Sequence, residues 1–171
     1  MADTVVTPRY GILSEEMREE RDQLIEMLTK AYWMEIETVM SYVANSINPD
    51  GVRAQEIIES LEEDVQEELG HARQFGERIK LLYGVVPGSS EFNAEQTYLQ
   101  PPDHQTDIVH VIKGVIEAES GAIEHYNHII EFCEGKDPVT QDMVIAILQD
   151  EEGHRRLFEG FLREYMAEGK A

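Results

Sequence analysis

Cysteine, long apolar runs and basic charge are all scarce in this chain of 171 residues. Cys133 is the only cysteine, which excludes an intrachain disulfide and any metal knuckle built from paired cysteines. No apolar stretch approaches the ~20 residues that a membrane helix needs. The first ten residues, MADTVVTPRY, are too polar for a signal peptide. These absences favour a cytoplasmic protein without a membrane partner.

Basic residues are outnumbered, with 14 Lys and Arg against 35 Asp and Glu and a net charge of −21. Binding to nucleic acid through its phosphates requires a basic surface stripe, so no direct nucleic-acid binding is expected. An acid excess can reflect only a solvated surface, or it can attract cations. The composition, 42% hydrophobic and 29% charged, is that of a globular chain. The local pattern must therefore decide between the two interpretations.

Four long segments show helical periodicity, and no segment has the alternation of a strand. Ser14 is a candidate N-cap for the first helix, and Asp137 followed by Pro138 is a typical start for the fourth. The short connections within the first and second pairs predict two antiparallel hairpins. After an N-terminal extension, residues 1–13, a single domain is predicted over 14–171. Its helices are predicted at about 14–47, 52–83, 106–133 and 138–167.

The stretch between the hairpins, residues 84–105, holds three of the six prolines. About 22 extended residues span up to ~70 Å, whereas a helix of ~30 residues is only ~45 Å long. The stretch can therefore travel the whole bundle and leave the second and third helices parallel. A domain boundary is the competing interpretation, but neither hairpin has enough faces to close a core alone. The predicted fold is an all-α, antiparallel four-helix bundle with one long crossover.

The apolar stripe of every predicted helix is interrupted by acid or histidine near its middle. A buried carboxylate without compensation costs several kcal/mol, and the nearby cations Lys30, Arg73 and Lys113 fall off the stripes. Two divalent metals would balance the four carboxylates. Oxygen-rich ligands with one imidazole per metal suit iron or manganese. The interrupting residues, the candidate metal ligands, are Glu35, Glu68, His71, Glu119, Glu151 and His154.

A single Glu-x-x-His on an acidic helix is usually a solvated pair, but here the pattern is repeated. Both hairpins contain a glutamate followed seven residues later by a tyrosine, and then Glu-x-x-His. The repeated pattern predicts one di-metal site with pseudo-two-fold symmetry. The paired positions are Glu35 and Glu119, Tyr42 and Tyr126, Glu68 and Glu151, and His71 and His154.

Residues next to the candidate ligands are expected to support them. Glu67 and Asp150 precede the second glutamates, and each could accept a hydrogen bond from the opposite histidine. Tyr42 and Tyr126 could donate to ligand carboxylates, although core aromatics with satisfied hydroxyls are nearly as common an outcome. Both repeats, EELGH and DEEGH, also contain a helix-weakening glycine, at position 70 and at position 153. We expect these glycines to let a neighbouring helix approach closely.

Other acids and histidines on the same helices lie off the apolar stripes. Glu37 and Glu117 share the polar faces of their helices and are expected to meet solvent. His125 and His128 are likewise expected at the surface. These four residues are therefore not included among the candidate ligands.

Several stretches resemble two related families. EELGHARQFGERIKLLYG and AILQDEEGHRRLFEG resemble the second and fourth helices of bacterioferritins and of bacterioferritin-related Dps-like mini-ferritins. GVIEAESGAIEHY resembles the third helix of the Dps-like group, and GKDPVTQDMVIAIL its junction with the fourth helix. The resemblance covers about residues 20–166, includes six matching ligand positions, and implies a ferritin-like fold with a di-iron ferroxidase centre. It also implies that Glu68 and Glu151 bridge the irons, with one glutamate and one histidine capping each end.

Three departures refine what the resemblance implies. Leu69 stands where bacterioferritins carry the haem-binding methionine, so no haem is expected. Only seventeen residues follow His154, too few for a fifth helix, which favours a homo-oligomeric cage of twelve subunits over one of twenty-four. Cys133 alone cannot form the cysteine pair that some Dps-like relatives carry near the site.

The resemblance implies a ferroxidase, an oxidoreductase acting on metal ions. It would oxidise Fe(II) with H2O2 or O2 and store Fe(III) as mineral inside a hollow cage, protecting against oxidative stress. Two Fe ions per subunit are expected, with Mn as an alternative. The main alternative is a non-storing di-iron or di-manganese peroxidase or catalase of the rubrerythrin or manganese-catalase type. A cargo protein with a vestigial site and a DNA-binding Dps protein are further alternatives.

Overall fold

The computed structural model describes residues 8–168 and contains, within that range, four α-helices, three short 3-10 turns and no strand. The α-helices are α1 (Arg18–Ile47), α2 (Gln55–Leu81), α3 (Ile108–Cys133) and α4 (Pro138–Glu168). The 3-10 turns are η1 (Glu15–Met17), η2 (Ser89–Glu91) and η3 (Thr97–Leu99). The predicted all-α fold is confirmed. Residues 1–7 of the predicted N-terminal extension and residues 169–171 of the predicted domain lie outside the described residues.

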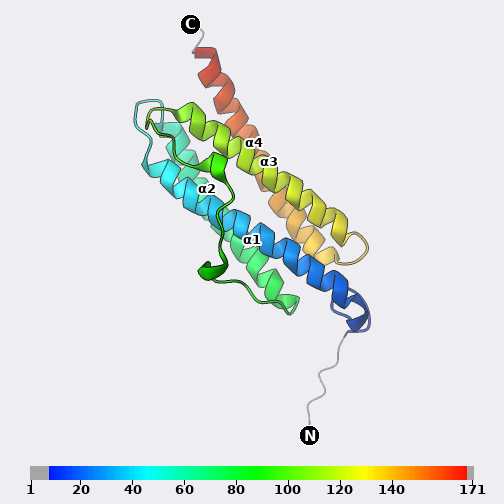
Figure 1. Ribbon diagram of the computed structural model, residues 1–171. Helices are drawn as coiled ribbons and strands as arrows, with labels where there is room; N and C mark the ends of the chain where they lie inside the picture. The colour runs from blue at the N-terminus through cyan, green and yellow to red at the C-terminus, as the bar shows by residue number, and fades with distance from the viewer. Residues whose placement is uncertain (1–7, 169–171) are drawn as a thin grey trace.

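The two hairpins pack side by side, and one long crossover joins them (Figure 1). The crossover leaves the end of α2 and runs along the bundle to the opposite end, where α3 begins, so α2 and α3 are parallel. It includes η2 and η3 and is not a boundary between separate units, because its residues bond to α1 and pack on α3. Among residues 8–168, no helix combines the length and the apolar character needed to cross a bilayer.

The first two helices begin later than predicted. The prediction that Ser14 caps the first helix is wrong: its side chain makes no capping bond, and η1 precedes the α-helical part. The second helix begins at Gln55 instead of at residue 52. Gly51 has a φ of +110°, so the chain completes a turn there before it can enter a helix.

The remaining helix ends are set by local hydrogen bonds. Helix α2 ends two residues early because Tyr83 has a φ of +68° and the Gly84 N–H bonds to the Ile79 carbonyl. Helix α3 begins at Ile108, after Asp107 accepts a hydrogen bond from the His110 N–H. For α4 the predicted cap is confirmed, since the N–H groups two and three residues on donate to Asp137 Oδ1.

Two apolar clusters fill the bundle, one on each side of the middle level of the helices. The first includes Leu28, Phe75 and Ile129, and the second includes Leu61 and Val115. Between them lie the buried acids and histidines of all four helices. The polar centre is therefore enclosed at both ends by hydrocarbon, in which unpaired charge is costly.

Candidate metal centre

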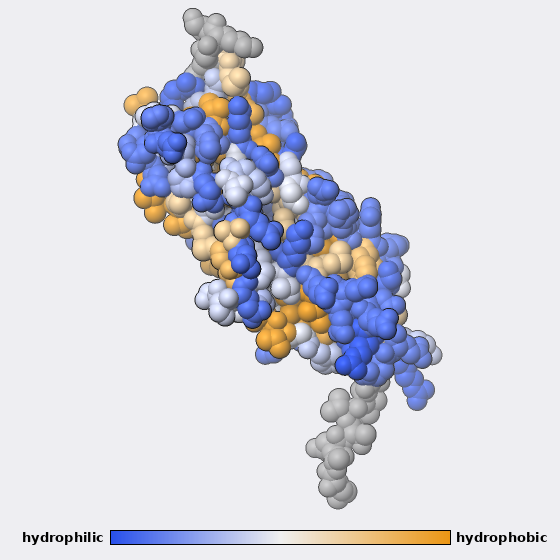
Figure 2. All heavy atoms as spheres, viewed as in Figure 1, coloured by the Kyte–Doolittle hydropathy of each residue, from blue (hydrophilic) through white to orange (hydrophobic). Residues whose placement is uncertain are grey.

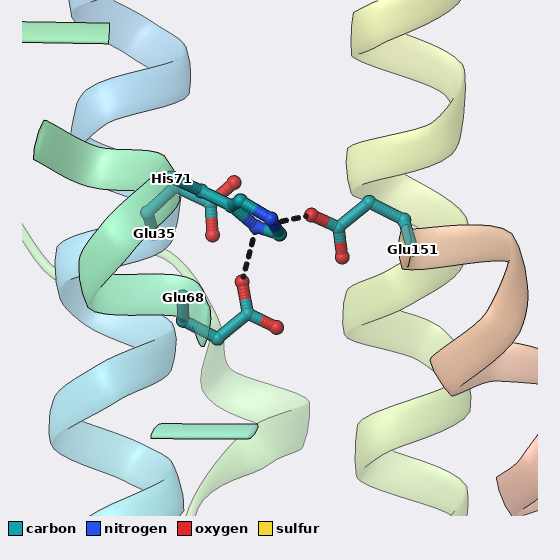
Figure 3. A group of neighbouring side chains, drawn as sticks. All are labelled: Glu35, Glu68, His71 and Glu151. Atoms are coloured by element: carbon teal, nitrogen blue, oxygen red, sulfur yellow. Dashed lines mark hydrogen bonds and ion pairs between the residues drawn. The ribbon is translucent and has the colours of Figure 1, made fainter. Parts of the chain in front are cut away.

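The six candidate ligands come together at this middle level, and each is at most 9% exposed. Their ligand atoms form two groups, each with all atoms within 4.8 Å of one another. Figure 3 shows the first group, with Glu35, Glu68 and His71 from the first hairpin facing Glu151 of α4. The second group contains Glu68, Glu119, Glu151 and His154. Glu68 and Glu151 belong to both groups, so they lie between two possible metal positions.

Both histidines turn the same nitrogen, Nδ1, toward the two shared carboxylates. His71 Nδ1 lies 3.4 Å from Glu68 Oε2 and 3.1 Å from Glu151 Oε1. His154 Nδ1 lies 3.4 Å from Glu68 Oε1 and 3.7 Å from Glu151 Oε2. Nδ1 is therefore the nitrogen that each ring offers to a metal.

The other ring nitrogens point outward across the seam between α2 and α4. His71 Nε2 lies 3.3 Å from Asp150 Oδ2, and His154 Nε2 lies 2.9 Å from Glu67 Oε2. Each histidine thus meets a carboxylate of the opposite hairpin, in the arrangement that the sequence pattern suggested. A carboxylate that accepts from Nε2–H leaves the lone pair on Nδ1, where a metal ligand needs it.

Two buried tyrosines hold the glutamates that are not shared. The Tyr42 hydroxyl, on α1, donates to Glu119 Oε1 on α3, and the Tyr126 hydroxyl, on α3, donates to Glu35 Oε1 on α1. Burial, together with the neighbouring carboxylates, raises the pKa of both tyrosines well above 10, so the hydroxyls remain donors. Both tyrosine hydroxyls therefore donate to candidate ligands, which is the first of the two interpretations that the sequence left open.

Protons balance the charge of the cluster when no cation is bound. Burial and the neighbouring carboxylates raise the pKa of Glu35 and Glu119, so both tend to stay neutral. Burial alone would lower the pKa of His71 and His154, but the contacts with Glu151 and Glu68 outweigh it and raise both values. The hydrogen bond with Glu35 and the contacts with the two histidines lower the pKa of Glu68 despite its burial, and the histidine contacts lower the pKa of Glu151. A metal must displace these protons.

Comparison with known proteins assigns the fold. Residues 13–166 match the ferritin-like domain family. The chain belongs to the ferritin-like family. It is 32% identical over 146 residues to a DNA protection during starvation protein of Pyrococcus furiosus, covering 82% of this chain and 77% of that protein. It is 27% identical over 144 residues to a bacterioferritin of Desulfovibrio desulfuricans, covering 83% and 76% of the two chains.

Solved structures with the ferritin-like fold superpose along most of the chain. A dodecameric thioferritin, the bacterioferritin-related protein of Bacteroides fragilis, matches with a TM-score of 0.77 and 24% identity, covering 88% of this chain and 90% of that one. The bacterioferritin of Desulfovibrio desulfuricans matches with a TM-score of 0.74 and 22% identity, covering 88% and 84%. These likenesses confirm the predicted ferritin-like four-helix bundle.

The residues of the ferritin-like centre fit a pair of cations. Among the described residues, buried polar atoms without a hydrogen bond of good geometry include Glu68 Oε1, Glu151 Oε1 and His154 Nδ1. The two buried arginines lie elsewhere: Arg78 binds Asp137, and Arg21 binds carbonyl groups near the start of the chain. Within residues 8–168, therefore, no side-chain cation other than imidazolium neutralises the cluster. Four carboxylates with two imidazoles form a donor set that suits iron or manganese.

Asp64 belongs to the surroundings of this centre but was not predicted. It is 6% exposed, its Oδ1 lies 3.7 Å from His154 Nε2, and its Oδ2 has no hydrogen-bond partner. Burial raises its pKa to about 7. The sequence did contain a signal, because Asp64 lies four residues before Glu68 and so shares its helix face.

Two predictions about neighbouring polar residues are wrong. Glu37 does not meet solvent: it is 5% exposed, and its Oε1 accepts hydrogen bonds from the N–H groups of Glu95 and Gln96 in the crossover. His125 is half-buried, with Nε2 bonded to the Met27 carbonyl. The predicted exposure of Glu117 and His128 is confirmed.

The expectation for the two glycines of the repeats is also wrong. A Cβ added at Gly70 or at Gly153 would meet no atom within 4 Å. Neither glycine therefore serves a close helix approach in the part of the chain that the structure describes. Such an approach does occur at Gly114, where a Cβ would lie 2.6 Å from the Tyr98 carbonyl oxygen. That glycine lets the crossover lie against α3.

Proposed function

We propose that this protein is a ferroxidase that binds two Fe ions per subunit, oxidises Fe(II) with H2O2 or O2, and stores Fe(III) as mineral in a hollow cage. The observation that carries the proposal is the pair of ligand groups that share Glu68 and Glu151. A single-metal site would not need two shared carboxylates between two histidines. Storage and protection against oxidative stress are proposed from the bacterioferritin and starvation-protection relatives.

Each residue has a distinct task in this proposal. Glu68 and Glu151 would bridge the metals, Glu35 and His71 would complete one position, and Glu119 and His154 the other. When bound, iron supplies the redox chemistry, giving up one electron per ion to the oxidant. The tyrosine hydroxyls orient the two outer glutamates, and Glu67 and Asp150 orient the imidazoles. The apolar clusters above and below exclude bulk water from the metals.

A cage requires contacts between copies, and α1 offers a surface for them. Met40, Val43 and Ile47 recur at helical spacing and are 49%, 41% and 73% exposed, so they form an apolar stripe away from the core. We propose a homo-oligomer, with twelve subunits favoured over twenty-four. Support comes from the dodecameric thioferritin of Bacteroides fragilis. No haem is proposed, since the residue after Glu68 is Leu69.

The acid excess suits a protein that collects cations. Figure 2 shows hydrophilic residues over much of one face of the molecule, with apolar groups scattered among them. A net charge of −21 attracts Fe(II) and repels nucleic-acid phosphates. We therefore propose iron as the cargo and no direct nucleic-acid binding.

Native mass and Fe(II) oxidation test the proposal together. The purified chain is expected to form a closed cage and to convert Fe(II) to a ferric mineral when O2 or H2O2 is added. Glu68→Ala should slow oxidation by about 100-fold or more, since even losing a residue that orients a metal ligand costs about 10- to 100-fold. The control Glu152→Ala, at an exposed position beside Glu151, should oxidise Fe(II) normally. A dimer or tetramer with peroxidase or catalase activity and no mineral would favour the non-storing alternative, with iron or manganese.

A further inference from the structure

A groove of about 660 Å³ opens between α1, the crossover and α3, on the side of the bundle away from His71 and His154. Five acids line it against a single lysine, so the groove is strongly acidic. Burial lowers the pKa of His125, another lining residue, which disfavours a positive charge on its imidazole. The acids are Glu26, Glu37, Glu91, Glu95 and Glu124, and the lysine is Lys30.

A second, much smaller cavity of about 10 Å³ lies directly among the metal ligands. It is lined by the four ligand glutamates together with Thr38, Met34 and Gln96. This volume is about that of one water-sized probe. Met34 and Gln96 line both the groove and the small cavity, so these two side chains form the wall between them.

Hydrogen bonds hold the Gln96 side chain in this wall. Its side chain is buried, and its Nε2 donates to Thr38 Oγ1 at 2.9 Å and to the Met34 carbonyl at 3.3 Å. Its backbone N–H is bound separately, at 2.7 Å from Glu37 Oε1. Rotation of the side chain would therefore break ordinary neutral hydrogen bonds while the backbone stays in place.

The crossover on either side of Gln96 is firmly fixed. The Asn45 amide donates to the Leu99 carbonyl at 2.8 Å, and the close approach at Gly114 leaves no room between the crossover and α3. In Figure 1 the crossover passes across α1 before it reaches the start of α3. Opening at this point therefore requires movement of one side chain and not displacement of the whole segment.

We propose that Gln96 gates a passage for divalent cations, which leads from the acidic groove between α1 and α3 to the four ligand glutamates. The passage rests on the proposed function, for which the cation is Fe(II). On the opposite side of the centre, between α2 and α4, the His71 and His154 imidazoles stand between the ligand glutamates and the outer carboxylates of Asp150 and Glu67.

The groove conducts cations without holding them. Among residues 8–168, the groups of three or more ligand atoms that converge within 4.8 Å are the two groups of the metal centre, and none lies in the groove. A surplus of acids without a convergent ligand set attracts a cation electrostatically but does not retain it. Such a surface raises the rate at which cations reach the gate.

Binding of Co(II) to the metal-free protein tests the passage without any redox step. Co(II) bound by carboxylate and imidazole absorbs visible light, so rapid mixing gives its binding rate, and titration gives its stoichiometry. Gln96→Ala is expected to bind Co(II) about tenfold faster than the wild type at unchanged stoichiometry, because the hydrogen bonds that keep the gate closed are gone. The matched control Gln105→Ala, at an exposed position of the same crossover, should bind at the wild-type rate.

Two further variants keep the test decisive. Thr38→Val removes only the hydroxyl that holds the Gln96 amide, so it should also speed binding, and it decides the matter if Gln96→Ala does not fold. Neutralising two acids of the groove with Glu91→Gln and Glu124→Gln should slow binding at low salt, and the difference should shrink as salt is added. Wild-type rates in the Gln96 and Thr38 variants, or in the double acid variant, would overturn the passage.

The outcomes separate the passage from the proposed function. If the wild type binds two Co(II) per subunit, and if Glu68→Ala abolishes this binding, the metal centre stands whatever the Gln96 variants do. If Asp150→Ala speeds binding while Gln96→Ala does not, cations reach the centre between α2 and α4, and the passage is wrong. If no Co(II) binds at the six residues, the proposed function fails and the passage fails with it.

Discussion

The two hairpins of the bundle repeat one another at the candidate metal centre and differ beside it. Each supplies a glutamate, a tyrosine, a second glutamate and a histidine at the same spacing. Each tyrosine binds a glutamate of the other hairpin, and each histidine meets a carboxylate of the other hairpin. Neither half of the centre is therefore complete without its partner, and the centre links the two hairpins.

The hairpins diverge at positions outside the six candidate ligands. Asp64 lies four residues before Glu68, but the equivalent position before Glu151 is the buried, apolar Ile147. Glu37, two residues after Glu35, holds the crossover, whereas Gly121 is its equivalent after Glu119. The repeated positions are those the proposed chemistry requires. The unrepeated ones fix the crossover and make the two ends of the centre unequal.

Among the changes that test this comparison, removing the unshared glutamates should have the largest effect on metal binding and ferrous oxidation. Glu35→Ala and Glu119→Ala should each lose one metal per subunit while the other metal remains, because each glutamate belongs to one ligand group only. Ferrous oxidation should fall by about 100-fold in both. Stoichiometry measured by Co(II) titration checks this, with the exposed Glu117→Ala as control. Loss of both metals in either variant would show that the two positions are not separate.

Lowering the pH should weaken metal binding at both ends alike. Carboxylate contacts raise the pKa of both histidines, and burial raises the pKa of both unshared glutamates, so these groups hold protons near neutrality. Metal must displace these protons, so affinity should fall by about tenfold to a hundredfold for each unit of decreasing pH. Co(II) titrations between about pH 6 and 8, with proton release followed by an indicator dye, measure this. Affinity independent of pH would contradict the proton-filled state.

Removing the tyrosine hydroxyls should have equal and smaller effects in the two hairpins. Tyr42→Phe and Tyr126→Phe each leave a buried carboxyl oxygen without its donor, which costs about 1–3 kcal/mol. Denaturant unfolding of the metal-free protein checks the cost. Phenylalanine keeps the aromatic ring at position 126, so the packing against Phe75, with ring centroids 5.3 Å apart, is not removed. An effect confined to one tyrosine would show that the pseudo-symmetry does not extend to the energetics.

Asp64→Asn should have the smallest effect, and that effect should be one-sided. Asp64 approaches His154 but has no counterpart near His71. Affinity should change by about tenfold or less for the metal at the His154 end and stay unchanged at the other end. Calorimetric titration that resolves two binding steps tests this, with the exposed Glu63→Gln as control. Equal changes in both steps would mean that Asp64 acts on the centre as a whole.

The sequence was sufficient for the features that follow from helix periodicity. The four helices, the crossover and the convergence of Glu35, Glu68, Glu119 and Glu151 all follow from which face each residue occupies. Glu37 could not be placed in this way, because its partners are backbone N–H groups 58 and 59 residues away. The end of α2 depends on the positive φ of Tyr83, a backbone conformation that no propensity of tyrosine favours. The contacts of Gln96 likewise depend on how the crossover lies, and periodicity does not describe a segment without regular structure.

Anomalous X-ray diffraction from crystals loaded with Fe(II) or Mn(II) tests the central claim most directly. Two metal peaks per chain are predicted, both within bonding distance of Glu68 and Glu151. One peak should lie beside Glu35 and His71, and the other beside Glu119 and His154. A single peak, or peaks away from Glu68 and Glu151, would contradict the di-metal centre.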